Sequence, residues 1–105
     1  MARTYADKPP EITEAAWQKQ VQQLAATFGY VDQYHTFFSR WSERGYPDLH
    51  LCNVRIGRDM YVECKSEKGK LSERQEHWRD VLIACGHEWY CWRPSQFDEV
   101  VEILQ

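Results

Sequence analysis

The sequence lacks the features that mark a membrane protein, a secreted protein or a strongly basic protein. No run approaches the roughly 20 consecutive apolar residues that a membrane-spanning helix needs, and the chain does not begin with the basic and then apolar stretch of a signal peptide. The formal net charge is -3, which argues against a protein that coats nucleic acid through charge alone. We therefore expect a cytoplasmic protein without a membrane partner.

Cysteine is sparse, and its spacing carries no zinc-finger or redox signature. The 4 cysteines include no C-x-x-C pair and no histidine at zinc-finger spacing. They are Cys52, Cys64, Cys85 and Cys91. We expect them to be reduced, small buried side chains. No base-reading helix or finger motif is present either, so any nucleic acid would be recognised through its shape and backbone.

What the sequence does contain is typical of one folded domain. Its 105 residues supply a single core, and 43% hydrophobic residues with 14% aromatic residues are too many for a disordered chain. We predict an N-terminal tail over residues 1–10 and a single domain over residues 11–105.

Apolar periodicity and end signals predict three helices. They are expected over residues 11–29, 71–86 and 97–104. Thr13, Ser72 and Ser95 are the expected N-caps of these helices, because a hydroxyl can accept a hydrogen bond from a free N–H of the first turn. Gly29 and Gly86 are the expected stops of the first two.

Runs of β-branched and aromatic residues predict four strands. They are expected over residues 30–38, 48–54, 60–66 and 87–93. The second and third are separated by a short connection, so an antiparallel hairpin is the simplest arrangement. The order is helix, three strands, helix, strand, helix, which predicts an α/β fold with a mixed central β-sheet flanked by helices.

The residues that carry chemistry lie on this hairpin. Asp48 opens one strand, and Glu63 and Lys65 point to one face of the next, so Asp48 can approach Glu63 across the strands. Two adjacent carboxylates repel each other unless a cation lies between them, and oxygen ligands suit Mg2+ or Mn2+. A solvated cross-strand charge pair gives the same pattern, so the motif alone leaves both interpretations open.

Four blocks occur in order along the chain: G-x-P-D-L at 45–49, E-x-K at 63–65, G-x-L-S-x-x-Q-x-x-W at 69–78 and W-R-P at 92–94. With the helical segment EAAWQKQVQQLAATFGY, they resemble the virus-type replication-repair nuclease (VRR-NUC) domain, a branch of the PD-(D/E)XK nuclease superfamily, over nearly the whole chain. The resemblance implies a restriction-endonuclease-like core, which agrees with the element order read from periodicity.

The resemblance also implies a metal site and catalytic residues. The implied ligands of Mg2+, with Mn2+ as a substitute, are Glu14, Asp48, Glu63 and the backbone carbonyl of Cys64. The implied catalytic residues are Asp48, Glu63, Lys65 and Gln75. Lys65 and Gln75 would position the water or the phosphate. Glu14 also fits an acid favoured by the helix dipole, and Gln75 also fits an exposed helix residue.

Polar and basic residues flanking the motifs are candidates for contacts with backbone phosphates, although an ordinary solvated surface fits them equally well. They are Ser39, Arg40, Trp41, Ser42, Arg44, Lys68 and Lys70. Trp41 stands alone among polar residues and could stack on a base. His50 shares the strand face of Asp48 and could touch the phosphate or a second metal, or could be a structural histidine.

The function that the resemblance implies is metal-dependent DNA cleavage that is selective for Holliday junctions or other branched DNA. The setting would be phage or bacterial replication, recombination or repair, and the protein would be a homodimer with two active sites for two strands. Two alternatives stay open at this point. One is a catalytically silent DNA-binding module of the same fold, and the other is a nuclease of this fold that acts on RNA or on DNA ends.

Overall fold

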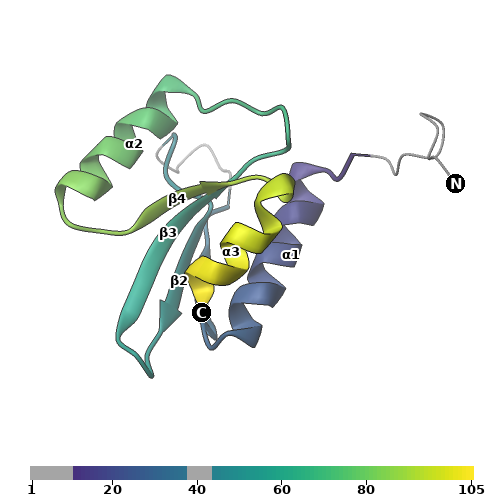
Figure 1. Ribbon diagram of the computed structural model, residues 1–105. Coiled ribbons are helices and arrows are strands. Elements are labelled where there is room, and N and C mark those ends of the chain that lie inside the picture. The colour runs from purple at the N-terminus through teal and green to yellow at the C-terminus, as the bar shows by residue number, and fades with distance from the viewer. Residues whose placement is uncertain (1–10, 38–43) are drawn as a thin grey trace, which may run out of the picture.

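The computed structural model describes residues 11–37 and 44–105. Its elements are α1 (Glu14–Thr27), β1 (Asp32–His35), β2 (Leu49–Asn53), β3 (Arg58–Cys64), α2 (Glu73–Ala84), β4 (Trp89–Trp92), the 3-10 helix η2 (Pro94–Gln96) and α3 (Phe97–Leu104). This order confirms the predicted α/β fold, and Figure 1 shows the sheet with helices on both of its sides. No helix in the described ranges has the length and apolar character to cross a bilayer.

The four strands form one mixed sheet in the order β1-β2-β3-β4. β1 pairs antiparallel with β2, and β2 with β3, whereas β4 runs parallel to β3 because α2 connects these two strands. The predicted hairpin is therefore confirmed. Its register pairs Leu49 with Val62, and this places Asp48, the residue before Leu49, beside Glu63, the residue after Val62.

One face of the sheet forms the core. Leu49 and Leu51 of β2 and Met60 and Val62 of β3 are buried, and the residues between them point to the opposite face, as the period of a strand requires. α1 and α3 lie side by side over this buried face (Figure 1). The helical residues that complete the core are Trp17, Val21, Ala25, Val100 and Leu104.

Two of the three predicted N-caps are confirmed. The Thr13 side chain accepts a hydrogen bond from the N–H of Ala16 at 3.1 Å, and Ser72 caps α2. The prediction that Ser95 caps α3 is wrong. Pro94 begins a 3-10 turn that runs directly into α3, so the N-cap is Gln96, without a side-chain bond.

The first strand is shorter than predicted. It covers Asp32–His35, whereas residues 30–38 were expected; residue 38 lies outside the described residues, and Tyr30 lies in the turn that follows α1. The N–H of Tyr30 donates to the Ala25 carbonyl at 2.9 Å, and the tyrosine ring is fully buried. The alternating pattern of this segment therefore includes residues that end the helix, so it predicted the start of the strand too early.

Arg58 joins three parts of the chain at the far end of the sheet, although the sequence predicted no role for it. Its guanidinium donates two hydrogen bonds to the Glu88 carboxylate, both at 2.8 Å, and a third to the Ile103 carbonyl at 2.7 Å. A bidentate pair of this kind fixes orientation as well as distance. It links β3 to the segment before β4 and to the end of α3.

Gly45 holds the segment before Asp48 against α2. Its φ is +82°, a region that favours glycine, and a Cβ at this position would lie 2.4 Å from the backbone carbon of Arg74. The glycine of the G-x-P-D-L block is therefore needed for a close approach between the chain and the first turn of α2.

Replacing Gly45 by alanine is expected to destabilise the protein more than the matched change Gly86→Ala. Both glycines have positive φ, but a Cβ at Gly86 would meet nothing within 4 Å. The backbone strain alone should cost Gly86→Ala about 1 kcal/mol, whereas the added clash should bring Gly45→Ala to about 3 kcal/mol. Urea unfolding measures both free energies, and equal losses would contradict the close approach.

Candidate active site

Asp48 and Glu63 meet at the end of the β2–β3 hairpin. The Glu63 side chain is buried, and the residue is 2% exposed. Asp48 is held in place by the neighbouring strand, because its Oδ2 accepts a hydrogen bond from the N–H of Cys64 at 2.8 Å. The two carboxylates predicted to lie together therefore do so.

The electrostatics of this pair are unusual for carboxylates. Burial raises the pKa of Glu63 to about 9, and the charge and hydrogen bond of Asp48 add to the shift. Lys65 lowers this pKa but does not offset the other causes. A buried acid beside a second acid either holds a proton or needs a positive charge in the proton's place.

Lys65 and Glu14 border the acid pair. The Lys65 ammonium lies 3.9 Å from Oε1 of Glu14, the first residue of α1, and its side chain is 13% exposed against 51% for Glu14. The backbone of Lys65 is fixed as well, because its N–H donates to the Trp92 carbonyl at 3.0 Å. The same carbonyl accepts the indole N–H of Trp17 at 2.9 Å, so α1, β3 and β4 are joined behind the site.

Gln75 connects helix α2 to the acid pair. Its Oε1 accepts from the N–H of Ser72 at 2.9 Å, which completes the capping box of α2. Its Nε2 donates to Oε1 of Glu63 at 3.0 Å. One amide side chain therefore both begins the helix and orients a buried carboxylate, and Gln75 is not a free surface residue.

The side chain of Cys64 is buried in the core, so only its backbone faces the acid pair. Sequence reasoning missed two neighbours on β4. Cys91 is paired with Glu63 in the parallel register, and Arg93 follows β4. The Arg93 guanidinium donates to the Gly69 carbonyl at 2.6 Å and lies 3.6 Å from the Cys91 sulfur, which holds the loop after β3. Arg93 belongs to the W-R-P block, so this block could have identified it from the sequence.

The donor set of the acid pair fits a hard divalent cation. Asp48, half-buried, and Glu63, buried, offer carboxylate oxygens. Glu14 lies at the exposed edge, 3.9 Å from the Lys65 ammonium, and does not form a close group of three carboxylates with them in the described structure. Mg2+ and Mn2+ prefer such oxygen ligands, and a cation would replace the proton that the raised pKa of Glu63 otherwise retains. The residues present are therefore suited to the implied metal.

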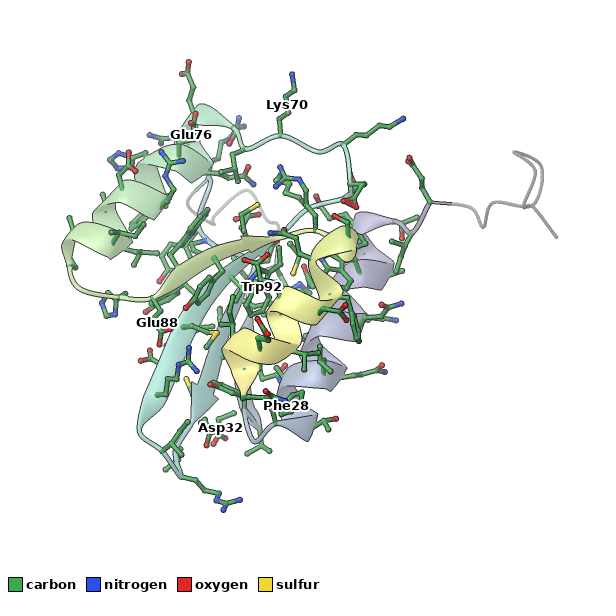
Figure 2. All side chains as sticks on the ribbon, viewed as in Figure 1. Phe28, Asp32, Lys70, Glu76, Glu88 and Trp92 are labelled. Carbon is green, nitrogen blue, oxygen red and sulfur yellow. The ribbon has the colours of Figure 1, made fainter. Side chains whose placement is uncertain are left out.

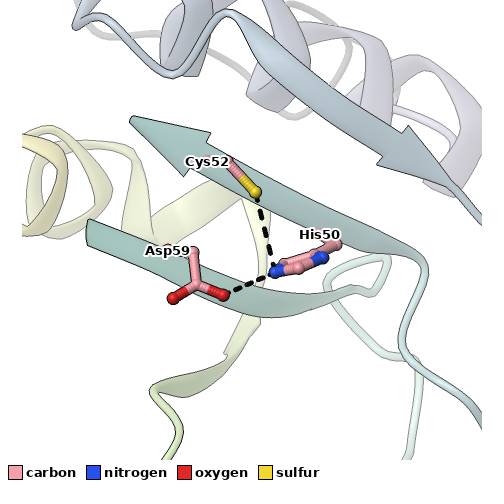
Figure 3. Close-up of side chains that lie close together, drawn as sticks. All are labelled: His50, Cys52 and Asp59. Carbon is pink, nitrogen blue, oxygen red and sulfur yellow. Dashed lines mark hydrogen bonds and ion pairs between the residues drawn. The ribbon is translucent and has the colours of Figure 1, made fainter. Parts of the chain in front are cut away.

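A second group of side chains lies farther along the same face of the hairpin. His50, Cys52 and Asp59 offer a nitrogen, a sulfur and an oxygen atom that all lie within 4.8 Å of one another (Figure 3). Among the described residues, no other group of three or more His, Cys, Asp or Glu side chains lies close enough together to hold a metal ion. It differs from the acid pair in both place and chemistry.

The predicted nucleic-acid contacts are only partly described. Ser39, Arg40, Trp41 and Ser42 lie outside the described residues. Arg44, Lys68 and Lys70 are exposed, and Lys70 extends from the loop before α2 into solvent (Figure 2). The Lys68 ammonium lies 3.7 Å from the Glu11 carboxylate.

A pocket of about 310 Å³ adjoins the site between α1 and β1. Glu14, Gln18 and His35 are among the residues that line it, and Gln18 and His35 share a hydrogen bond of 2.7 Å. These polar groups continue the surface of the acid pair along α1.

Comparisons with known proteins agree with the resemblance in the sequence. A sequence model of the VRR-NUC domain matches residues 10–93. A solved structure described as a VRR_NUC domain protein has a similar fold, with a TM-score of 0.61 and 17% sequence identity over 91% of this chain and 88% of the other. No curated protein matches the sequence.

The buried acid pair predicts a specific pH dependence of stability in a metal-free buffer that contains a chelator. The folded-state pKa of Glu63, about 9, exceeds its ordinary value of 4.5, so the folded chain binds more protons than the unfolded chain between these values. The contribution of Glu63 is fully present below pH 4.5 and is lost as the pH rises towards 9.

Glu63→Gln should remove this loss, so the variant should gain stability relative to wild type as the pH rises through that window. Urea unfolding at several pH values measures the difference. Glu102→Gln, a change of an exposed glutamate on α3, should leave the wild-type profile in place. Parallel profiles for wild type and Glu63→Gln would show that Glu63 is an ordinary ionised carboxylate.

Proposed function

Since the chain belongs to the VRR-NUC domain family, we propose that it is a divalent-metal-dependent nuclease that hydrolyses phosphodiester bonds in DNA. The family is of the nuclease type. The metal dependence and the catalytic residues that we propose are inferred from the side chains at the end of the β2–β3 hairpin. The observation that carries the proposal is the meeting of Asp48, buried Glu63 and Lys65 at one point.

The acids would hold the metal. Asp48 and Glu63 are the proposed central ligands, with Glu14 and the Cys64 carbonyl completing the set. Bound Mg2+ or Mn2+ would supply positive charge to the phosphate and lower the pKa of a water molecule. The hydrogen bond from Cys64 to Asp48 supports this role, because a carboxylate that is already oriented loses less freedom on binding.

Lys65 and Gln75 would position the reacting groups. The Lys65 side chain is largely buried, so its ammonium is restricted to the neighbourhood of Glu14 and the acid pair. There it can donate hydrogen bonds to the attacking water or to the negative charge that develops on the phosphate. Gln75 acts through Glu63, whose Oε1 it holds by a hydrogen bond of 3.0 Å.

The surface around the site would contact the DNA backbone. Arg44, Lys68 and Lys70 are exposed beside the motifs, and Ser39, Arg40, Trp41 and Ser42 remain proposed contacts. The pocket between α1 and β1 offers polar side chains next to Glu14. Because none of these groups belongs to a base-reading motif, recognition would depend on the shape and charge of the substrate.

The proposed substrate is branched DNA such as a Holliday junction, cut by a homodimer during replication, recombination or repair in the cytoplasm of a bacterium or a phage-infected host. A single chain of 105 residues offers little surface for a four-way junction, whereas a dimer would present two sites to two strands. β1 is an edge strand of the described sheet and carries the exposed Tyr34. Such an edge is open to pairing with a second copy.

Metal-dependent cleavage is the direct test of the activity. With Mg2+ or Mn2+, wild type should cut plasmid and branched DNA, and a chelator should abolish cutting. Asp48→Asn and Lys65→Ala should each lower the cleavage rate by roughly 100-fold or more, the usual effect of removing one group that stabilises a transition state. Arg55→Ala, an exposed change in the β2–β3 turn, should cut at the wild-type rate.

DNA binding by the same variants separates the alternatives. Asp48→Asn and Lys65→Ala should still bind DNA while cutting it poorly. If wild type binds DNA tightly and shows no metal-dependent cleavage, the protein is a binding module and the proposed activity is wrong. Faster cutting of RNA or of free DNA ends than of junctions would favour the other alternative.

Oligomeric state and substrate preference can be measured together. In solution, light scattering should give twice the 12.6 kDa mass of one chain. A dimer should cut a four-way junction faster than a linear duplex of the same length. A monomeric mass at the concentrations that give junction cleavage would contradict the paired-site proposal but not the nuclease activity.

A further inference from the structure

Three different ligand atoms converge on the outer face of the β2–β3 hairpin. Nε2 of His50 lies 2.6 Å from Oδ2 of Asp59 and 3.7 Å from Sγ of Cys52, as the dashed lines in Figure 3 show. His50 and Cys52 are alternate residues of β2, and Asp59 is the cross-strand partner of Cys52 on β3. The pleat therefore brings all three side chains to one face.

Nε2 of His50 cannot donate to Asp59 and accept from Cys52 at the same time. In a neutral imidazole, a given ring nitrogen either carries a proton or offers a lone pair. If Nε2 of His50 donates to Asp59, it cannot accept a proton from the Cys52 thiol. If it accepts from the thiol, it faces a carboxylate oxygen at 2.6 Å with no proton from the ring between them.

We propose that His50, Cys52 and Asp59 form a binding site for a Zn2+-like transition-metal ion, separate from the acid pair. Imidazole nitrogen, thiolate sulfur and carboxylate oxygen are the ligands that Zn2+ takes in proteins. Magnesium disfavours such a mixed set, because it prefers oxygen ligands alone. The thiol proton of Cys52 passes to solvent when the ion binds.

The distances suit a tetrahedral site. With the usual bond lengths, Zn2+ separates a nitrogen from a sulfur ligand by about 3.6 Å and a nitrogen from an oxygen ligand by about 3.3 Å. The observed separation of 3.7 Å between Nε2 and Sγ needs almost no adjustment. Asp59 has to withdraw by roughly 0.7 Å from its hydrogen bond, and its side chain is 47% exposed and can turn.

The surroundings favour a cation and give it access. Burial, and then the charges of Asp59 and Asp32, raise the pKa of the Cys52 thiol. The two carboxylates therefore place negative charge near the sulfur, which a bound cation would offset. Asp32 is the cross-strand partner of Cys52 on β1, so its charge lies on the same side of the sheet as the proposed site. An open pocket of about 190 Å³ is lined by Cys52 and Asp59, among others, and gives an entry path from solvent.

A neighbouring aromatic ring orients the histidine. The rings of His50 and Tyr61 are stacked, with their centroids 4.3 Å apart and their planes 8° from parallel. On β3, Tyr61 stands between Glu63 of the acid pair and Asp59 of the proposed site. Along this face of the hairpin, the proposed site begins at His50, next to the acid pair, and extends to Cys52 and Asp59 towards the β2–β3 turn, so the ion would hold β2 to β3 beside Asp48 and Glu63.

Cobalt and zinc titrations of the full-length, metal-free protein test the site. Co2+ should give the near-ultraviolet charge-transfer absorption of a thiolate-bound ion, and Zn2+ should abolish it by displacement. Zn2+ affinity, measured by competition with a chromophoric chelator, should fall at least tenfold in each of Cys52→Ser, His50→Gln and Asp59→Asn. Zn2+ should also raise the melting temperature of wild type but not of Cys52→Ser.

Two controls locate the ion. Cys85→Ser removes an exposed thiol elsewhere, and Glu63→Gln alters the acid pair, so both should keep the absorption. Circular dichroism of the metal-free variants checks that each one folds. If Cys52→Ser does not fold, Asp59→Asn, which changes a partly exposed side chain, replaces it in the test of metal binding. The proposal is overturned if wild type gives no thiolate absorption, if Cys52→Ser retains it, or if Glu63→Gln abolishes it.

Discussion

The structure depends most on two adjacent carboxylates, of which Glu63 is buried and Asp48 is half-buried. They lie side by side at the end of a hairpin, where burial of Glu63 and the neighbouring charge of Asp48 both raise the pKa of Glu63. A fold built for stability alone would place an apolar pair there, because unpaired buried charge is costly. Either a proton on Glu63 or a bound cation removes the repulsion between the two acids. A bound cation is what the proposed cleavage requires, so this buried position connects the fold to the chemistry.

Each contact that fixes the acids also belongs to the framework of the fold. The N–H that orients Asp48 comes from Cys64, whose side chain is in the core. The amide that orients Glu63 belongs to Gln75, which also caps α2. The N–H of Lys65, the residue after β3, donates to the Trp92 carbonyl. The site is therefore rigid for the same reasons that the domain is, which is the preorganisation that electrostatic catalysis requires.

The sequence predicted those parts that depend on neighbours in the chain. Alternation and a short turn define the β2–β3 hairpin, and from its register the meeting of Asp48 with Glu63 follows directly. Local chemistry likewise marks the caps at Thr13 and Ser72. The catalytic and metal-binding roles of these residues stay predictions, because position alone does not test them.

Features that depend on distant parts of the chain were not predictable in this way. Gly45 has to lack a side chain because the backbone of Arg74 lies against it. Arg58 on β3 contacts Glu88, just before β4, and Ile103 on α3. Nothing in the local sequence around these residues records their partners. The wrong cap at Ser95 has a local cause, since Pro94 starts a 3-10 turn that moves the helix boundary by one residue.

The most direct measurement of the central claim is anomalous diffraction from a crystal soaked in Mn2+. The account predicts an anomalous peak between the carboxylates of Asp48 and Glu63, within reach of Glu14. A peak confined to other exposed carboxylates, with Asp48 and Glu63 still in contact and no ion between them, would contradict it.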